Sequence, residues 1–159
     1  AALRRAPRPD IETVHLSSVT HPSGHPLDAA ICGALQRARA DVIFLAGYMK
    51  RLGPRTLAAF PARILNTHPA LLPRFGGQGM FGDRVFEAVL AGSESESGAS
   101  VHLVDAEYDT GAVVSQERIR VLPGDTVESL KARVQACERE LIVKTLAAIA
   151  SGELVLHSP

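Results

Sequence analysis

The sequence contains no tryptophan, 4% aromatic residues and only two cysteines among its 159 residues. Cys32 and Cys137 both lie in helix-like apolar patterns, so we expect reduced core thiols and no disulfide framework. The sequence also lacks an excess of either charge, because 17 basic residues balance 17 acidic ones. That balance gives no electrostatic reason to expect nucleic acid or an anionic membrane as a partner.

Long apolar segments are also missing. No apolar run reaches the roughly 18 residues of a transmembrane helix, and no signal-peptide pattern appears, so we expect a cytoplasmic protein. The length of 159 residues fits a single domain. The chain opens with AALRRAPRPD and has no initiating methionine, which predicts a longer native polypeptide upstream.

Strand and helix patterns alternate along the chain. Short segments rich in apolar and β-branched residues predict strands at 11–16, 41–47, 63–66, 100–104 and 112–121. Apolar residues spaced by three and four predict helices at 27–39, 83–91 and about 125–152, and Pro54 begins a short helix to about residue 60. The run SESESG (93–98) predicts a polar loop, and Asp125 and Glu128 have the spacing of a capping box.

This alternation predicts an α/β fold of the Rossmann-like type. We expect an open twisted sheet that is mostly parallel, with antiparallel strands toward its C-terminal edge and helices on both faces. Ligands bind such sheets beyond the carboxyl ends of the strands. Two predicted strands end in 47–49 and in 66–68, so we expect these segments to face one cleft.

The segment ILNTHPALLPRFGG (64–77) is the most promising carrier of chemistry. Asn66 and His68 lie two residues apart, so in a strand their side chains share a face. Pro69 and Pro73 then prevent the strand from continuing in the sheet. A histidine is a suitable general acid or base near neutral pH, and an asparagine amide can donate to a developing oxyanion. The alternative is a histidine bonded to nearby backbone and an asparagine that closes a turn.

A carboxylate beside the imidazole is expected in the loop DAEYDTG (105–111). Asp109 precedes Thr110 and Gly111, so its backbone can turn tightly and direct its side chain into a cleft. We expect the charge of Asp109 to raise the pKa of His68 and help it act as an acid. Asp105 and Glu107 are more typical of solvated turn residues.

Other polar residues carry weaker signals. His21 and His25 have a spacing that could suit a metal, but no cysteine or carboxylate cluster lies near them, so we predict no metal site. The glycine-rich segment 76–79 lacks the lysine and hydroxyl of a nucleotide phosphate loop and predicts a flexible loop. His102 lies in a predicted strand and is interpreted as a core or edge residue.

Three separated segments, NTHPALLPRFGG, GASVHLV and DAEYDTGAVVSQ, closely resemble the folate-dependent formyltransferases, in particular those of purine biosynthesis. The resemblance extends from LAGYMKRLG (45–53) to about residue 152. It implies an enzyme that transfers the formyl group of 10-formyltetrahydrofolate to the amine of glycinamide ribonucleotide. We expect no metal, and either a monomer or a homodimer.

The resemblance also assigns site residues. It makes Asn66, His68 and Asp109 the catalytic residues: the first two would stabilise the oxyanion, with His68 protonated, while Asp109 would support the imidazolium and help a water relay the amine's proton. The folate-binding residues it implies are Met49, Lys50, Arg51, Leu52, Asn66, Asp105, Ala106, Glu107, Tyr108 and Asp109. The substrate-binding residues it implies are Gly47, Pro69, Gln135, Ala136, Cys137 and Glu138, with Glu138 near the amine. Arg51 departs from the family, which usually has an apolar residue there.

The start of the chain also departs from the family. Nothing before Ile11 matches the family's first strand or the loop that binds the ribonucleotide phosphate. We therefore expect residues 1–159 to be a single formyltransferase domain without its N-terminal strand and phosphate-binding loop. The alternatives are another folate-dependent formyltransferase, a formyltetrahydrofolate hydrolase, or a non-catalytic folate-binding fragment.

Overall fold

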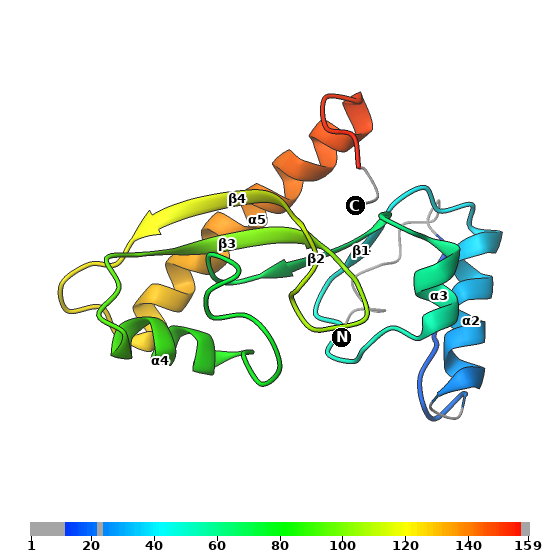
Figure 1. The fold of residues 1–159 in the computed structure, drawn as a ribbon, viewed down its shortest axis with the longest axis horizontal. Coiled ribbons are helices and arrows are strands. Elements are labelled where there is room, and N and C mark those ends of the chain that lie inside the picture. Colours follow the sequence, from blue (N-terminus) through cyan, green and yellow to red (C-terminus); the bar gives the residue numbers. More distant parts are fainter. Residues whose placement is uncertain (1–11, 22–23, 157–159) are drawn as a thin grey trace. The chain divides into compact units, whose positions relative to one another are not determined.

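The computed structural model describes residues 12–21 and 24–156 (Figure 1). The chain divides into two compact units. The first unit comprises Ala1–Asp41 and Leu52–Ala59, and the second unit comprises Val42–Arg51 and Phe60–Pro159.

The first unit contains α2 (His25–Arg37) and α3 (Pro54–Ala59). The buried Asp28 carboxylate accepts hydrogen bonds from the backbone N–H groups of Arg55 and Thr56, at 2.9 and 3.1 Å. One helix therefore supplies the N-terminal cap of the other, because the first N–H groups of a helix have no partner within it. Gly53 makes this approach possible, since a Cβ atom there would lie 2.2 Å from Cγ of Asp28.

The predicted strand at 11–16 is wrong over 12–16, which have no regular structure, and Ile11 lies outside the described residues. The side chains of residues 12–15 are exposed. β-Branched residues favour strands because they pack on a sheet, and these residues have no such surface to cover. The predicted helix at 27–39 begins two residues earlier, with a proline in its first turn.

The described part of the second unit contains a four-stranded sheet in the order β1-β2-β3-β4. The strands are β1 (Ile43–Leu45), β2 (Ile64–His68), β3 (Glu96–Leu103) and β4 (Val113–Arg120). β1 and β2 are parallel, whereas the β2–β3 and β3–β4 pairs are antiparallel. The predicted α/β class with an open mixed sheet is confirmed, and its parallel part is the first pair.

The predicted polar loop at 93–98 is wrong from Glu96 onward, because β3 begins there. Glu96, Ser97 and Gly98 pair with β4 despite their polar composition. Gly98 is required at this position, since a Cβ atom would lie 2.0 Å from the carbonyl oxygen of Glu117. Pairing across the sheet thus outweighs local strand propensity.

Two helices, α4 (Asp83–Ala91) and α5 (Val127–Ser151), complete the second unit, and α5 lies along β3 and β4 (Figure 1). One core cluster joins α5 to the sheet through Leu65, Ala99, Val101, Leu103 and Leu141. A second cluster joins α4 to α5 through Phe86, Val89, Leu130 and Val134. Among the described helices, none combines the length and hydrophobicity needed to cross a membrane.

The N-terminus of α5 is capped one residue later than predicted. Thr126 is the N-cap, and its side chain and that of Ser129 form the reciprocal hydrogen bonds of a capping box. Asp125 instead accepts a hydrogen bond from the Leu122 backbone N–H at 2.7 Å. The predicted pair of Asp125 and Glu128 is therefore wrong, because Asp125 closes the preceding turn.

Candidate active site

The second unit holds a cleft of about 710 Å³ at the end of β2, a volume typical of small-molecule sites. Its lining comprises Gly47, Tyr48, Met49, Asn66, Thr67, His68, Pro69, Gly77, Gln78, Gly79, Met80, Phe81, Gly82, Tyr108, Asp109 and Glu138. The predicted catalytic residues Asn66, His68 and Asp109 all belong to it. The loop after β3 thus meets the end of β2, as the sequence predicted.

His68 is buried at the end of β2, with 4% of its surface exposed. Its Nε2 lies 2.6 Å from the carbonyl oxygen of Phe75, which can only accept, so this nitrogen carries a proton and donates it. Its Nδ1 lies 3.4 Å from Oδ2 of Asp109. Both ring nitrogens therefore face oxygen atoms.

Asp109 has a backbone φ of +57°, a left-handed conformation that is uncommon for a residue other than glycine. The backbone N–H of Gly77 donates to Oδ2 of Asp109 at 3.0 Å. The other carboxylate oxygen, Oδ1, lies 3.4 Å from Nε2 of His102. The strained backbone thus holds a carboxylate between two imidazoles, and strain of this kind concentrates at functional sites.

His102 is buried in β3, as its interpretation as a core residue requires, but it also contacts the predicted catalytic residues. It lies directly opposite Asn66 in the β2–β3 pair, which brings the two side chains together. Its Nδ1 donates to the Leu103 carbonyl at 2.8 Å, and its Nε2 lies 3.4 Å from Nδ2 of Asn66. His102 therefore connects Asn66 with Asp109.

Burial has the largest effect on the pKa of His68 and lowers it. The charge of Asp109 and the hydrogen bond to the Phe75 carbonyl raise this pKa, but the net shift is downward. Asp109 thus raises the pKa of His68 as expected, but burial outweighs this effect. For Asp109, burial raises the pKa, whereas hydrogen bonds from His102 and the Gly77 N–H, with the nearby imidazole charges, give a lower pKa overall.

The residues predicted to bind folate divide into two groups. Met49, Tyr108, Asn66 and Asp109 line the cleft. Those outside its lining are Lys50, Arg51, Asp105, Ala106 and Glu107. Arg51 instead connects two segments: it donates to the Ala106 carbonyl and pairs with the Glu107 carboxylate at 3.0 Å. Leu52 belongs to the first unit.

Among the residues predicted to bind substrate, Gly47, Pro69 and Glu138 line the cleft. Gln135, Ala136 and Cys137 precede Glu138 on α5 and lie outside the lining. The Thr67 hydroxyl donates to Oε1 of Glu138 at 2.6 Å, which fixes this carboxylate at the wall of the cleft.

The segments 47–49 and 66–68 both line the cleft, as predicted, but sequence reasoning missed the segment from Gly77 to Gly82 as a part of it. The flexible loop predicted at 76–79 contributes Gly77, Gln78 and Gly79 to the lining. A signal was present in the sequence, because Met80 and Phe81 are large apolar residues between glycines and fit no helix or strand period. Among the described residues, no cluster of three or more histidine, cysteine or acidic side chains could hold a metal ion.

Comparison with known proteins identifies the family of this chain. The formyl transferase family model matches residues 1–146. The chain belongs to the formyltransferase family. It is 42% identical over 128 residues to the chloroplastic phosphoribosylglycinamide formyltransferase of Arabidopsis thaliana, covering 80% of this chain and 44% of that protein. It is 43% identical over 139 residues to the phosphoribosylglycinamide formyltransferase of Mycobacterium tuberculosis, covering 87% of this chain and 61% of that protein.

A solved formyltransferase structure has the same fold. The glycinamide ribonucleotide transformylase 1 of Symbiobacterium toebii superimposes with a TM-score of 0.85 and 37% identity, over 98% of this chain and 71% of that chain. This likeness, together with the open mixed sheet, confirms the predicted Rossmann-like α/β fold. The chain spans less than two thirds of the length of either named sequence relative.

Proposed function

We propose that the protein transfers the formyl group of 10-formyltetrahydrofolate to the amine of glycinamide ribonucleotide in purine biosynthesis. The observation that carries this proposal is the contact of His68 with Asp109 at 3.4 Å, in a cleft shared with Asn66, in a chain of the formyltransferase family. The named relatives act, by their names, on the same acceptor. We include a cytoplasmic location and a monomer or homodimer in this proposal.

The cleft has properties that suit a folate. Met49, Phe81 and Tyr108 line it with large apolar side chains that are 63%, 51% and 37% exposed. Exposed apolar and aromatic side chains in a concave site are suited to cover a flat heterocycle. The folate supplies a formyl group bonded to nitrogen, and the residues of this chain orient that group and manage the protons.

The residues of the trio have complementary roles in the proposed transfer. The Asn66 amide donates to the oxygen that gains negative charge when the amine attacks the formyl carbon. His68 begins the reaction neutral, because burial lowers its pKa, with Nε2–H donated to Phe75. Its Nδ1 faces Asp109 and can take up the proton that the amine loses through a water beside that carboxylate, which then stabilises the imidazolium. The imidazolium returns this proton to the folate nitrogen as the bond between that nitrogen and the formyl carbon breaks, so His68 acts first as a base and then as an acid.

The acceptor is proposed to bind near Glu138. Its carboxylate, held by the Thr67 hydroxyl at 2.6 Å, is an acceptor of hydrogen bonds from a substrate amine or amide. Gly47 and Pro69 line the same cleft. The roles of Lys50, Arg51, Leu52, Asp105, Ala106 and Glu107 toward folate, and of Gln135, Ala136 and Cys137 toward the substrate, stay predictions.

The test is a steady-state assay of formyl transfer from 10-formyltetrahydrofolate to glycinamide ribonucleotide, with water alone as the competing acceptor. We expect transfer to the ribonucleotide, and we expect His68→Ala to lower kcat by roughly 10²- to 10⁴-fold because it removes the base. Thermal unfolding of the variant, measured alongside, establishes that the loss of activity is not a loss of fold.

Each alternative gives a different result in this assay. Formate release without the ribonucleotide product would indicate a formyltetrahydrofolate hydrolase, and transfer to a different amine would indicate another formyltransferase. Folate binding with neither reaction would leave a folate-binding protein. Turnover of His68→Ala near the wild-type value would contradict the assigned role of His68.

A further inference from the structure

The loop from Pro69 to Gly77 holds both titratable members of the predicted catalytic trio. The Phe75 carbonyl accepts the Nε2 proton of His68 at 2.6 Å, and the Gly77 N–H donates to Asp109 at 3.0 Å. The Phe75 contact decides which ring nitrogen carries the proton in neutral His68, because the hydrogen bond of one nitrogen sets the state of the other. The conformation of this loop therefore determines how His68 presents Nδ1.

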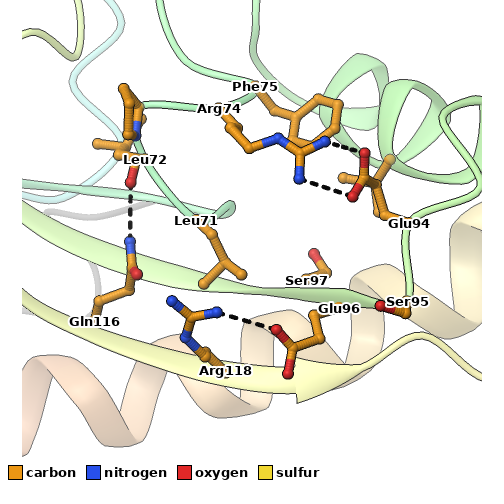
Figure 2. Close-up of a pocket in the computed structure, with 12 residues that line it drawn as sticks. Leu71, Leu72, Arg74, Phe75, Glu94, Ser95, Glu96, Ser97, Gln116 and Arg118 are labelled. Atoms are coloured by element: carbon orange, nitrogen blue, oxygen red, sulfur yellow. Dashed lines mark hydrogen bonds and ion pairs between the residues drawn. The ribbon is translucent and has the colours of Figure 1, made fainter.

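The start of the loop is fixed by two side chains from the sheet. Ser100 is fully buried in β3, accepts from the Leu72 N–H at 3.1 Å and donates to the Ala70 carbonyl at 2.7 Å. Gln116 of β4 donates through Nε2 to Ser100 Oγ at 2.8 Å and to the Leu72 carbonyl at 3.2 Å, as Figure 2 shows for Leu72. The backbone groups of two buried residues, Ala70 and Leu72, thus have partners that they would otherwise lack.

Leu72 packs directly against Gly76 near the end of the loop. A Cβ atom on Gly76 would lie 2.4 Å from Cδ2 of Leu72 and 3.2 Å from Cβ of Asp109. Gly76 is therefore in close contact with Leu72 on one side and Asp109 on the other, and it directly follows Phe75. A shift of Leu72 toward Gly76 would therefore displace the residue that directly follows Phe75, because close-packed atoms transmit displacement.

Gln116 itself lies away from the cleft. It lines a separate cavity of about 240 Å³ behind the loop, together with Leu72 and Phe75 (Figure 2). It touches none of Asn66, His68 and Asp109 by a hydrogen bond in the described part of the chain. Its side chain can therefore affect the reaction only indirectly, through Ser100 and the loop that the two residues hold.

We propose that Gln116, acting with Ser100, is a positioning residue for His68: it fixes Leu72 and thereby keeps the Phe75 carbonyl in place to hold the imidazole. This inference rests on the proposed function for its kinetic consequence, but the orientation of His68 can be measured without any activity. Replacing a residue that only stabilises the fold would leave the orientation of His68 in the folded protein unchanged.

The test replaces Gln116 by Met, which keeps the length of the side chain and removes both donated hydrogen bonds. Glu117→Met is the matched control, since Glu117 is the exposed neighbour on the same strand. In Gln116→Met we expect kcat to fall by roughly 10- to 100-fold, as misplacement of a reacting group does, with KM for both substrates within about twofold. Glu117→Met retains wild-type kcat.

The second readout is an NMR titration of the His68 imidazole, which needs no substrate. We expect a lower pKa of His68 and a changed Nε2 signal in Gln116→Met, because the hydrogen bond to the Phe75 carbonyl raises this pKa in the intact protein. Wild-type His68 signals in a folded Gln116→Met would overturn the proposal, whatever the activity. Changed signals without measurable formyl transfer would support it and contradict the proposed function instead.

If Gln116→Met does not fold, Gln116→Asn serves in its place. This variant keeps the amide but shortens its reach by one methylene, so we expect the same changes of kcat and of the His68 signals in smaller measure. Unchanged kcat together with unchanged His68 signals in a folded Gln116→Asn would overturn the proposal.

Discussion

Two features of the site shift the pKa of His68 in opposite directions, and Asp109 is one of them. Burial lowers the pKa of His68, whereas the charge of Asp109 raises it. Asp109→Asn removes that charge and keeps an oxygen that can accept from the Gly77 N–H. We therefore expect a pKa of His68 below its wild-type value in this variant, measured by NMR titration of the imidazole.

Asp105→Asn is the control for this titration, because Asp105 hydrogen bonds to Thr110 and to the Glu107 N–H rather than to His68. We expect it to leave the pKa of His68 unchanged. A pKa of His68 that is unchanged or higher in Asp109→Asn would show that the two side chains do not interact as the 3.4 Å contact implies.

Two buried serines of β3 give a second comparison at the scale of single residues. Within the described part of the chain, Ser97 Oγ has no hydrogen-bond partner, whereas Ser100 Oγ bonds to Ala70, Leu72 and Gln116. Ser97→Ala removes a hydroxyl that is buried without a partner, so we expect the free energy of unfolding to stay the same or to rise by about 1 kcal/mol. Ser100→Ala leaves the Leu72 N–H unpaired, and we expect a loss of about 1–3 kcal/mol.

Denaturant unfolding of both serine variants measures these differences. Equal losses in the two variants would mean that Ser97 has a partner that stabilises it. A negligible loss in Ser100→Ala would mean that the backbone of the loop from Pro69 to Gly77 finds other partners, which would also weaken the inferred role of Gln116.

Replacement by alanine is expected to have opposite effects on stability at a glycine in a strand and at a glycine in a helix. In β3, a Cβ atom on Gly98 would lie 2.0 Å from the Glu117 carbonyl oxygen, so Gly98→Ala forces β3 and β4 apart. We expect a loss of about 3 kcal/mol or more in the free energy of unfolding. In α2, a Cβ atom on Gly33 would meet only the mobile end of Arg37, at 3.3 Å, and we expect a gain of up to about 1 kcal/mol in Gly33→Ala.

Urea unfolding of the two glycine variants tests the register of β3 against β4. Wild-type stability of Gly98→Ala would contradict the close pairing of Gly98 with Arg118 and the passage of Glu117 over it. A loss in Gly33→Ala would indicate a backbone at Gly33 that alanine cannot adopt.

Elements were predictable where the local pattern agrees with the tertiary environment. The α4 helix and the strand β4 follow from apolar periodicity and alternation, since each places its apolar residues against a neighbour. The start of β3 was not predictable in this way, because Ser97 and Gly98 enter the sheet only through pairing with β4. The same reason explains residues 12–16, whose strand-like composition has no sheet to join in the described structure.

The spatial arrangement of the three residues proposed to be catalytic could be predicted only in part from the sequence. Asn66 and His68 share a face because strands have a period of two, which the sequence displays directly. Asp109 followed from the tight turn that its neighbours allow. The contact of His102 with Asn66 depends on the antiparallel register of β2 with β3, which no local pattern specifies. The lowered pKa of His68 depends on burial by the whole second unit, so it too was outside the reach of local reasoning.

The pH dependence of the free energy of unfolding reflects titratable groups in both units. A histidine with a lowered pKa in the folded state stabilises the protein fully above its unfolded pKa of about 6.5, and this contribution falls as pH drops below that value. His68 contributes in this window. Carboxylates with lowered pKa contribute fully above about 3.9 and lose that contribution at lower pH. Asp109 in the second unit and Asp28 in the first belong to this group.

We therefore expect the free energy of unfolding to decline as pH falls from about 6.5, and to decline further below about 3.9. Burial raises the pKa of Asp28, but hydrogen bonds from the Thr56 hydroxyl and the N–H groups of Arg55 and Thr56 lower it overall. Asp28→Asn should thus flatten only the acidic decline, and His68→Gln only the decline that begins near pH 6.5. Urea unfolding at a series of pH values measures both. Loss of the upper decline in Asp28→Asn, or its persistence in His68→Gln, would mean that a group other than His68 takes up the proton.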